Sequence, residues 1–282
     1  MSGLIYTAFI LAIAPLVSLL WMAVTEGWGE LSWDFFTKNG QGITLENHAT
    51  GAAHALVGTL LITAMTALIS VPLGIMTAVY LVEYGRKSAL AKAVTFLVDI
   101  MTGIPSIVAG LFAAAMIPTI ARLTWATESE ALQMRTGLMG AVALVVLMTP
   151  IVVRNTEEML RLVPNELREA SYALGVTKAS TIIRVVLRTA LPGIVSGVVI
   201  AIARVIGETA PLLITTGVTD VFNFNLFDGT MRTLPTYVYS MWNNAATRPL
   251  AWSGALTLIL LVLLLNLIAS WIKKAYAPKG EK

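Results

Sequence analysis

The chain has 282 residues, of which 57% are apolar and only 12% are charged, and its formal net charge is +3. Soluble domains carry about twice this share of charged residues, so the composition excludes a soluble globular domain, a coiled coil and a disordered chain. It predicts an integral membrane protein. There is no cysteine, which excludes disulfides and thiolate chemistry.

Apolar stretches that are long enough to cross a bilayer recur six times along the chain. A transmembrane helix needs about 20 apolar residues with few charges, and the gaps between charged residues meet this condition at residues 1–25, 47–82, 93–121, 136–153, 189–219 and 249–272. The first stretch lacks a basic flank and is too long for a cleaved signal peptide. We therefore expect an all-α, polytopic protein with six transmembrane helices, the first of them uncleaved.

Lysine and arginine residues indicate the orientation of these helices. If the N-terminus lies inside, most of them fall in the inner segments 83–92, 154–188 and 273–282. Basic residues favour the cytoplasmic side, so we expect both termini inside. The outer segment 26–50 is acidic and aromatic, and either contacts a partner protein on the outer side or covers the first helix. His48 and His54 have no suitably spaced acid beside them, so no metal site is expected.

Three charged residues interrupt the apolar stretches. Arg204 and Glu208 are four residues apart, so one continuous helix would place both on one face. A charge inside a membrane costs roughly 2.5–3.5 kcal/mol or more, and such residues usually face a polar interior. The two residues either line a substrate pathway or form a structural ion pair, and we favour the pathway. Asp99 lies near the inner end of its span, where we expect a structural pair with an inner arginine.

The inner segment 154–188 has the pattern of a helical corner. Asn165 follows a proline and is a suitable N-cap, and Gly175 is a suitable residue to end the helix. Leu167, Ala170 and Leu174 share one face at helical spacing. A second helix then enters the membrane. The short helix is either a lever for a partner protein or an amphipathic helix on the lipid surface.

Residues 169–175, which read EASYALG, resemble the EAA loop of ABC importer permeases. The resemblance implies a type I ABC importer (MetI-like) permease fold. It also implies that the short helix is a coupling helix, which docks in a groove of the ATP-binding subunit. The residues that the resemblance assigns to this contact are Glu169, Ala170, Ser171, Leu174 and Gly175. Ser171 stands where the family usually has a second alanine.

Three further motifs resemble the permeases of phosphate importers, and the PstA-type subunit more than its PstC-type sister. They are RVIGETAPLL at 204–213, GIPSIVAGLF at 103–112 and TLPTYVY at 233–239. The resemblance implies a phosphate pathway that includes Arg204, Glu208, Thr209 and Ser106. A permease for another oxyanion, such as sulfate or molybdate, is the near alternative. A secondary transporter or channel is the distant one.

The same resemblance implies the partners and the division of labour. We expect a heterodimer with a PstC-type permease, two PstB-type ATPase subunits and a PstS-type phosphate-binding protein, in the cell inner membrane and without nucleic acid. The chain has no P-loop and no catalytic motif. ATP and Mg are therefore expected on the partner ATPase, and no enzymatic activity is expected in this chain.

The expected organisation is a first helix and outer segment at 1–52, a permease domain at 53–276 with the coupling loop at 157–188, and a tail at 277–282.

Overall fold

The computed structural model describes residues 2–42, 51–85, 88–124 and 126–276, and within these ranges all regular structure is helical. Six of its helical stretches are long and apolar enough to cross a membrane, which confirms the predicted all-α, polytopic architecture. The elements are α1 (Ser2–Gly27), α2 (Trp33–Thr37), α3 (Ala53–Val79), η1 (Tyr80–Tyr84), α4 (Ala89–Thr102), α5 (Ser106–Thr124), α6 (Glu128–Gln133), α7 (Gly137–Arg161), α8 (Asn165–Ala173), α9 (Lys178–Thr181), η2 (Ile182–Val186), α10 (Leu187–Ile206), α11 (Ala210–Thr215), α12 (Leu234–Trp242), η3 (Ala245–Thr247) and α13 (Arg248–Tyr276).

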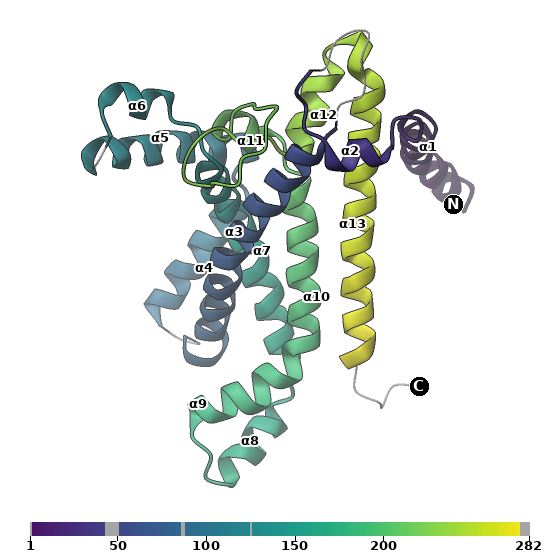
Figure 1. The fold of residues 1–282 in the computed structure, drawn as a ribbon. Coiled ribbons are helices and arrows are strands. Elements are labelled where there is room, and N and C mark those ends of the chain that lie inside the picture. Colours follow the sequence, from purple (N-terminus) through teal and green to yellow (C-terminus); the bar gives the residue numbers. More distant parts are fainter. Residues whose placement is uncertain (1, 43–50, 86–87, 125, 277–282) are drawn as a thin grey trace.

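Helices α3, α7 and α10 form the centre of the bundle, and α13 packs along α10 (Figure 1). Their shared core is aliphatic and includes Ile62, Leu144, Met148, Val152 and Val205. Helices α8 and α9 extend below the bundle, at the same end as the C-terminal end of α13, and α6 and α12 lie at the opposite end. The predicted inner segment around α8 and the C-terminal end of α13 therefore lie at one end of the molecule.

Two of the predicted spans are not continuous helices, so the prediction of one helix in each is wrong. The span 93–121 is divided between α4 and α5 at Gly103–Pro105, and the span 189–219 is divided between α10 and α11 at Gly207–Thr209. The physical reason is local: glycine has low helix propensity, and proline lacks the amide that would continue the hydrogen bonds. Gly103 and Gly207 each end a helix, and Pro105 and Pro211 follow them.

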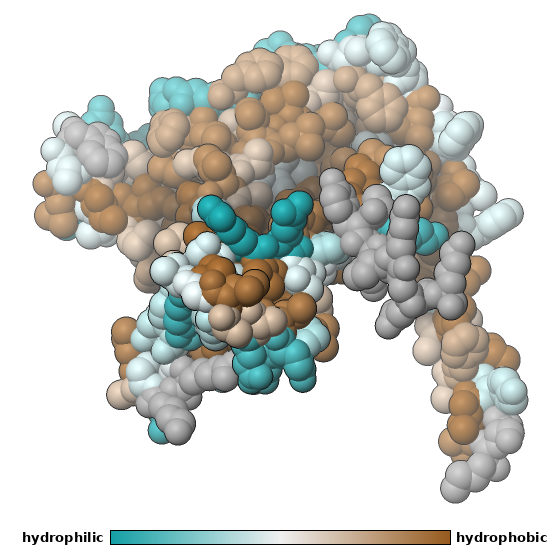
Figure 2. Space-filling view, turned by 90° about the horizontal axis from the view of Figure 1, so that it is seen from below, coloured by the Kyte–Doolittle hydropathy of each residue, from teal (hydrophilic) through white to brown (hydrophobic). Residues whose placement is uncertain are grey.

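Within the described residues, the buried part of helix α1 lies at its C-terminal end. Ser253 on α13 donates a hydrogen bond to the Gly27 carbonyl at 2.8 Å, and Ala23 is fully buried near this contact. Most other α1 side chains are exposed and apolar. In Figure 2 the helix projects from the bundle as an arm with a largely hydrophobic surface. An apolar surface of this length needs lipid or another apolar chain as its cover.

Small residues allow helices to approach closely where α5 crosses α11. A Cβ atom added to Gly110 would lie only 2.6 Å from the Cα atom of Pro211. A larger side chain at this position must push the two helices apart, since the obstacle is backbone. Close packing through small residues is a common device in membrane helix bundles.

We therefore expect Gly110→Val to destabilise the protein by about 1–3 kcal/mol, the usual cost of overpacking. Thermal unfolding in detergent, followed by circular dichroism, measures the loss. Gly29→Val is the matched control, because no atom lies within 4 Å of a Cβ added at Gly29. An equal unfolding midpoint for both variants would contradict the close contact between α5 and α11.

Candidate functional site

The two helix breaks meet at a cavity of about 240 Å³ that is open at the surface of this chain, where Arg204 and Thr102 are exposed. Its lining comes from the end of α4, the start of α5, the middle of α7 and the end of α10. The lining residues are Met101, Thr102, Ile104, Ser106, Leu147, Pro150, Ile151, Arg204, Val205 and Glu208. Three of the four predicted pathway residues thus share one cavity, and the fourth, Thr209, follows Glu208 outside this lining.

Arg204 and Glu208 do not have the relation that the sequence predicts. Arg204 lies in the last turn of α10, Gly207 ends the helix, and Glu208 stands in the break, where its amide donates to the Val205 carbonyl at 3.1 Å. The prediction that both residues share a face of one helix is therefore wrong. Within the ranges that the structure describes, the Arg204 guanidinium forms no ion pair with Glu208 or with any other acid. The N–H groups of the Arg204 guanidinium are therefore available to another acceptor.

The cavity has the electrostatic character of an oxyanion site. The Arg204 guanidinium supplies a full positive charge and a planar fork of donors, which suits the oxygens of phosphate-like groups. Helix α5 begins at Ser106, so its N-terminal amides add a partial positive charge at the cavity. Glu208 adds one negative charge to the same lining. An anion can therefore bind here without being held so tightly that it cannot leave.

Asp99 forms an ion pair with Arg154, which confirms the expected structural pair between this acid and an inner arginine. The pair joins α4 to α7. Arg154 also donates to Glu157 at 2.9 Å, and Glu157 accepts in turn from Arg161. The apolar span predicted from the sequence ends at residue 153, but α7 continues to Arg161. These ion pairs allow the helix to continue through a charged segment, because the charges satisfy one another.

The predicted coupling helix is present as α8, at the tip of the segment that extends below the bundle (Figure 1). Pro164 occupies the N-cap position that was predicted for Asn165, one residue earlier. Gly175 has a φ of +76°, a left-handed conformation that glycine adopts without strain, and it ends the helix as predicted. Thr177 is then the N-cap of α9. The helical corner predicted from the sequence is therefore formed.

The residues that were predicted to contact an ATPase are mostly on the outer surface of α8. Glu169, Ala170, Leu174 and Gly175 are exposed, and the Leu174 side chain is 83% exposed. Ser171 is the exception, because it is buried and its hydroxyl lies 2.8 Å from the hydroxyl of Thr181 on α9. Seen from below, this part of the molecule presents a small apolar patch that hydrophilic side chains surround (Figure 2). Such a surface can enter a groove on another protein.

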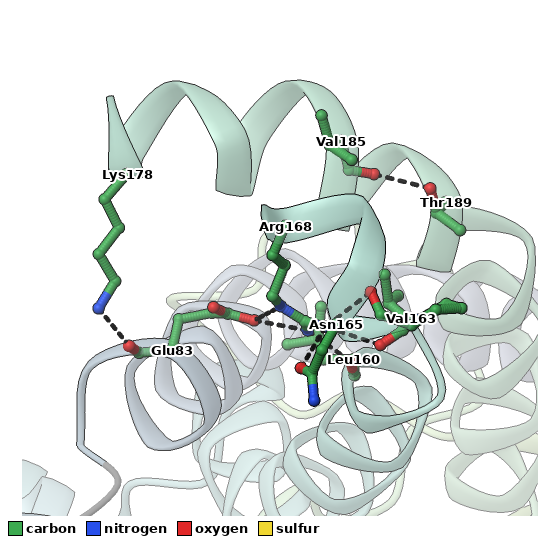
Figure 3. Close-up of polar contacts among 9 residues, drawn as sticks. Glu83, Leu160, Val163, Asn165, Arg168, Lys178, Val185 and Thr189 are labelled. Atoms are coloured by element: carbon green, nitrogen blue, oxygen red, sulfur yellow. Dashed lines mark hydrogen bonds and ion pairs between the residues drawn. The ribbon is translucent and has the colours of Figure 1, made fainter. Parts of the chain in front are cut away.

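A buried ion pair at the base of α8 was not predicted from the sequence. Arg168 on α8 contacts Glu83, in the last turn of the helical stretch that begins with α3, and both side chains are buried (Figure 3). The only sequence signal was an acid at the inner end of an apolar span. It did not indicate a partner, because Arg168 lies 85 positions later in the chain.

The outer end holds a second buried polar cluster. Arg232 is buried and pairs with Asp220, and burial lowers the pKa of its guanidinium while raising the pKa of the Tyr237 hydroxyl. His54 lies in α3, with its ring centroid 6.0 Å from that of Tyr237. His48 lies outside the described residues. Among those described, no three His, Asp or Glu side chains gather as ligands for a metal ion.

Comparison with known proteins identifies the family. Residues 70–281 match the family described as binding-protein-dependent transport system inner membrane component. The phosphate transport system permease protein PstA 1 of Mycobacterium tuberculosis is 46% identical over 271 residues, which cover 95% of this chain and 86% of that protein. PstA of Haemophilus influenzae is 38% identical over 274 residues, which cover 95% of this chain and 90% of that protein.

Solved structures show the same fold at low sequence identity. A chain of the inward-facing MetNI methionine ABC transporter superimposes with a TM-score of 0.58 at 21% identity, covering 80% of this chain and 94% of that one. A chain of a bacterial ABC transporter that imports alginate superimposes with a TM-score of 0.67 at 16% identity, covering 98% and 96%. The predicted MetI-like permease fold is confirmed. The chain belongs to the family of binding-protein-dependent inner membrane transport components and, within it, to the PstA group of permeases.

Proposed function

We propose that this protein is the permease subunit of an ATP-driven importer of inorganic phosphate, and that it forms half of the translocation pathway. The observation that carries the proposal is the cavity at the two helix breaks, where Arg204 has no acidic partner among the described residues. The identity to PstA permeases supports phosphate as the anion.

Four residues that line or adjoin the cavity have a part in the passage of phosphate. Arg204 binds the oxygens transiently through its guanidinium fork. Ser106 offers a hydroxyl at the N-terminal end of α5, and Thr209 offers another where α11 begins. Glu208 repels the anion enough to let it leave, since transport requires binding that is favourable but weak.

The other subunits supply what this chain lacks. A PstC-type permease forms the second half of the pathway, and the apolar surface of α1 is suited to a partner within the bilayer. Two PstB-type ATPases bind ATP and Mg, and one of them holds α8 through Glu169, Ala170, Leu174 and Gly175, with Ser171 fixing α8 to α9 behind the contact. A PstS-type protein delivers phosphate to the outer end. The chain itself catalyses no reaction and binds no cofactor.

Transport by the purified four-component complex in proteoliposomes tests the proposal. Uptake of phosphate, sulfate and molybdate is measured side by side, with and without ATP. We expect uptake of phosphate alone, and only with ATP. Uptake of sulfate or molybdate instead would overturn the substrate assignment. Uptake by this chain alone, without ATP, would replace the ABC mechanism with a channel.

Glu208→Gln tests the release role separately. Removing the negative charge beside Arg204 should tighten phosphate binding in the cavity and slow its release, so we expect a lower maximal uptake rate together with a lower half-saturating concentration. If the repulsion between Glu208 and the anion is of the size typical for coupling between sites, about 1–3 kcal/mol, its loss should slow release about fivefold or more. Uptake kinetics measure both quantities. Unchanged kinetics would remove Glu208 from the pathway.

A further inference from the structure

The attachment of α8 to the rest of the bundle depends on one buried arginine. Figure 3 shows Arg168 pointing from α8 into the corner between the ends of α3 and α7. Its Nη2 atom lies 2.8 Å from Glu83 Oε1 and its Nε atom lies 3.2 Å from the same oxygen. Arginine forms such forked contacts with carboxylates in a fixed geometry. The pair therefore sets the direction of α8 relative to α3.

The same guanidinium also caps the end of α7. It donates to the Leu160 carbonyl at 3.0 Å and to the Val163 carbonyl at 2.7 Å, and more weakly to the Asn165 side-chain oxygen at 3.4 Å. The last carbonyls of a helix have no partner within the helix. Arg168 supplies that partner and thus ties three elements together: η1, which continues α3, through Glu83; α7 through its last turn; and α8, on which it stands.

A second side chain fastens the other side of the corner. Lys178, at the start of α9, donates to the Glu83 backbone carbonyl at 2.5 Å (Figure 3), and its ammonium lies 4.5 Å from the centre of the Tyr84 ring. Glu83 and Tyr84 belong to η1, a π-helical turn that closes with a hydrogen bond from the Gly85 amide to the Tyr80 carbonyl at 2.7 Å. Such turns are rare and often stand at functional positions. Glu83 thus contacts α8 through its side chain and α9 through its backbone carbonyl.

We propose that the Glu83–Arg168 pair is a positioning pair, which makes α8 move as one body with the inner ends of α3 and α7. The inference rests on the proposed function, because it concerns how an ATPase acts on this permease. Helix α7 runs from Leu160 to the cavity, where Pro150 and Ile151 form part of the lining. A displacement of α8 is therefore delivered to the helix that shapes the cavity, instead of being lost in the short connection at 162–164.

A purely structural role makes a different prediction. Breaking a buried pair by removing one partner leaves a buried, unpaired charge and strongly destabilises a protein, whereas replacing both partners by well-packed apolar residues of similar volume is often neutral. If the pair only stabilised the fold, the double replacement would restore stability and transport together. If the pair positions α8, the double replacement restores assembly and leaves coupling impaired.

The experiment compares Glu83→Met, Arg168→Met and the double variant in the complete transporter, in proteoliposomes that contain the phosphate-loaded binding protein. Phosphate uptake and ATP hydrolysis are measured in the same vesicles. We expect both single variants to assemble poorly. The double variant should assemble normally and hydrolyse ATP. The amount of phosphate that it carries per ATP hydrolysed should fall at least about fivefold. A wild-type ratio in the assembled double variant would overturn the proposal.

Matched controls remove the same chemical groups from the surface. Glu158→Met on α7 and Arg188→Met on α10 replace exposed side chains for which no ion pair is present in the described part of the chain. Both should keep the wild-type ratio of phosphate to ATP. If the wild-type complex transports no phosphate, the proposed function is refuted. If the wild-type complex transports phosphate, a lower ratio of phosphate to ATP in the double variant is due to loss of the pair.

A distance measurement tests the positioning without relying on phosphate. The chain has no cysteine, so nitroxide labels can be placed at Glu166→Cys on α8 and Met76→Cys on α3, both of which are exposed. We expect a narrow distance distribution between the labels in the otherwise wild-type complex, and a broad one when Glu83→Met and Arg168→Met are added. Equally narrow distributions would show that α8 keeps its place without the pair, and would overturn the proposal.

Discussion

Replacing Arg204 by lysine should reduce ATP-driven phosphate uptake at least about tenfold, while the complex still assembles and hydrolyses ATP. Lysine keeps the positive charge but loses the planar fork that contacts two oxygens at once. A hydrogen bond to a charged group contributes about 1.5–3 kcal/mol, which corresponds to about tenfold or more in binding. Arg204→Gln, which removes the charge as well, should abolish uptake.

The measurement is uptake in proteoliposomes across a range of phosphate concentrations, with ATP hydrolysis followed in parallel. Arg184→Lys is the matched control, because Arg184 is an exposed arginine at the inner end of the same helical stretch and has no ion pair among the described residues. It should transport normally. Normal uptake by Arg204→Lys and Arg204→Gln would show that the arginine is structural and that phosphate takes another route.

The sequence could predict what depends on local pattern. Hydropathy is a property of consecutive residues, so the apolar spans were found, and the ion pair of Asp99 followed from the cost of a lone charge near the membrane. The corner at Gly175 could be predicted as well, because a capping glycine and helical periodicity are short-range signals. In each case the physical cause lies within a few residues of the feature.

The parts that could not be predicted depend on contacts between distant segments. The signals for the two helix breaks were present as Gly103, Pro105, Gly207 and Pro211, but transmembrane helices often tolerate such residues, so the sequence alone did not decide between a kink and a break. That both breaks open on one cavity depends on the packing of α5 and α10 against α7. The Glu83–Arg168 pair joins two elements with no shared local pattern, and only the folded chain reveals it.

The exposed leucine of α8 gives the second large prediction. Leu174→Asp should release the ATPase subunit that holds α8 from the purified complex and abolish uptake. The side chain is 83% exposed in this chain, so the substitution should leave the permease itself stable. In a docking groove, however, a carboxylate would be buried without a partner, and the contribution of the leucine, about 1.5–3 kcal/mol when fully buried, would also be lost. The amount of ATPase that co-purifies with the permease is the measurement.

Leu132→Asp is the matched control, since Leu132 on α6 is 81% exposed at the opposite end of the molecule. The complex with this variant should retain its ATPase. The comparison also separates the two interpretations of the inner helix that the sequence left open. If α8 lies on lipid instead of in an ATPase groove, Leu174→Asp will co-purify with as much ATPase as Leu132→Asp does. Selective loss of the ATPase from Leu174→Asp places the leucine in the contact, because both variants introduce the same charge at an equally exposed leucine.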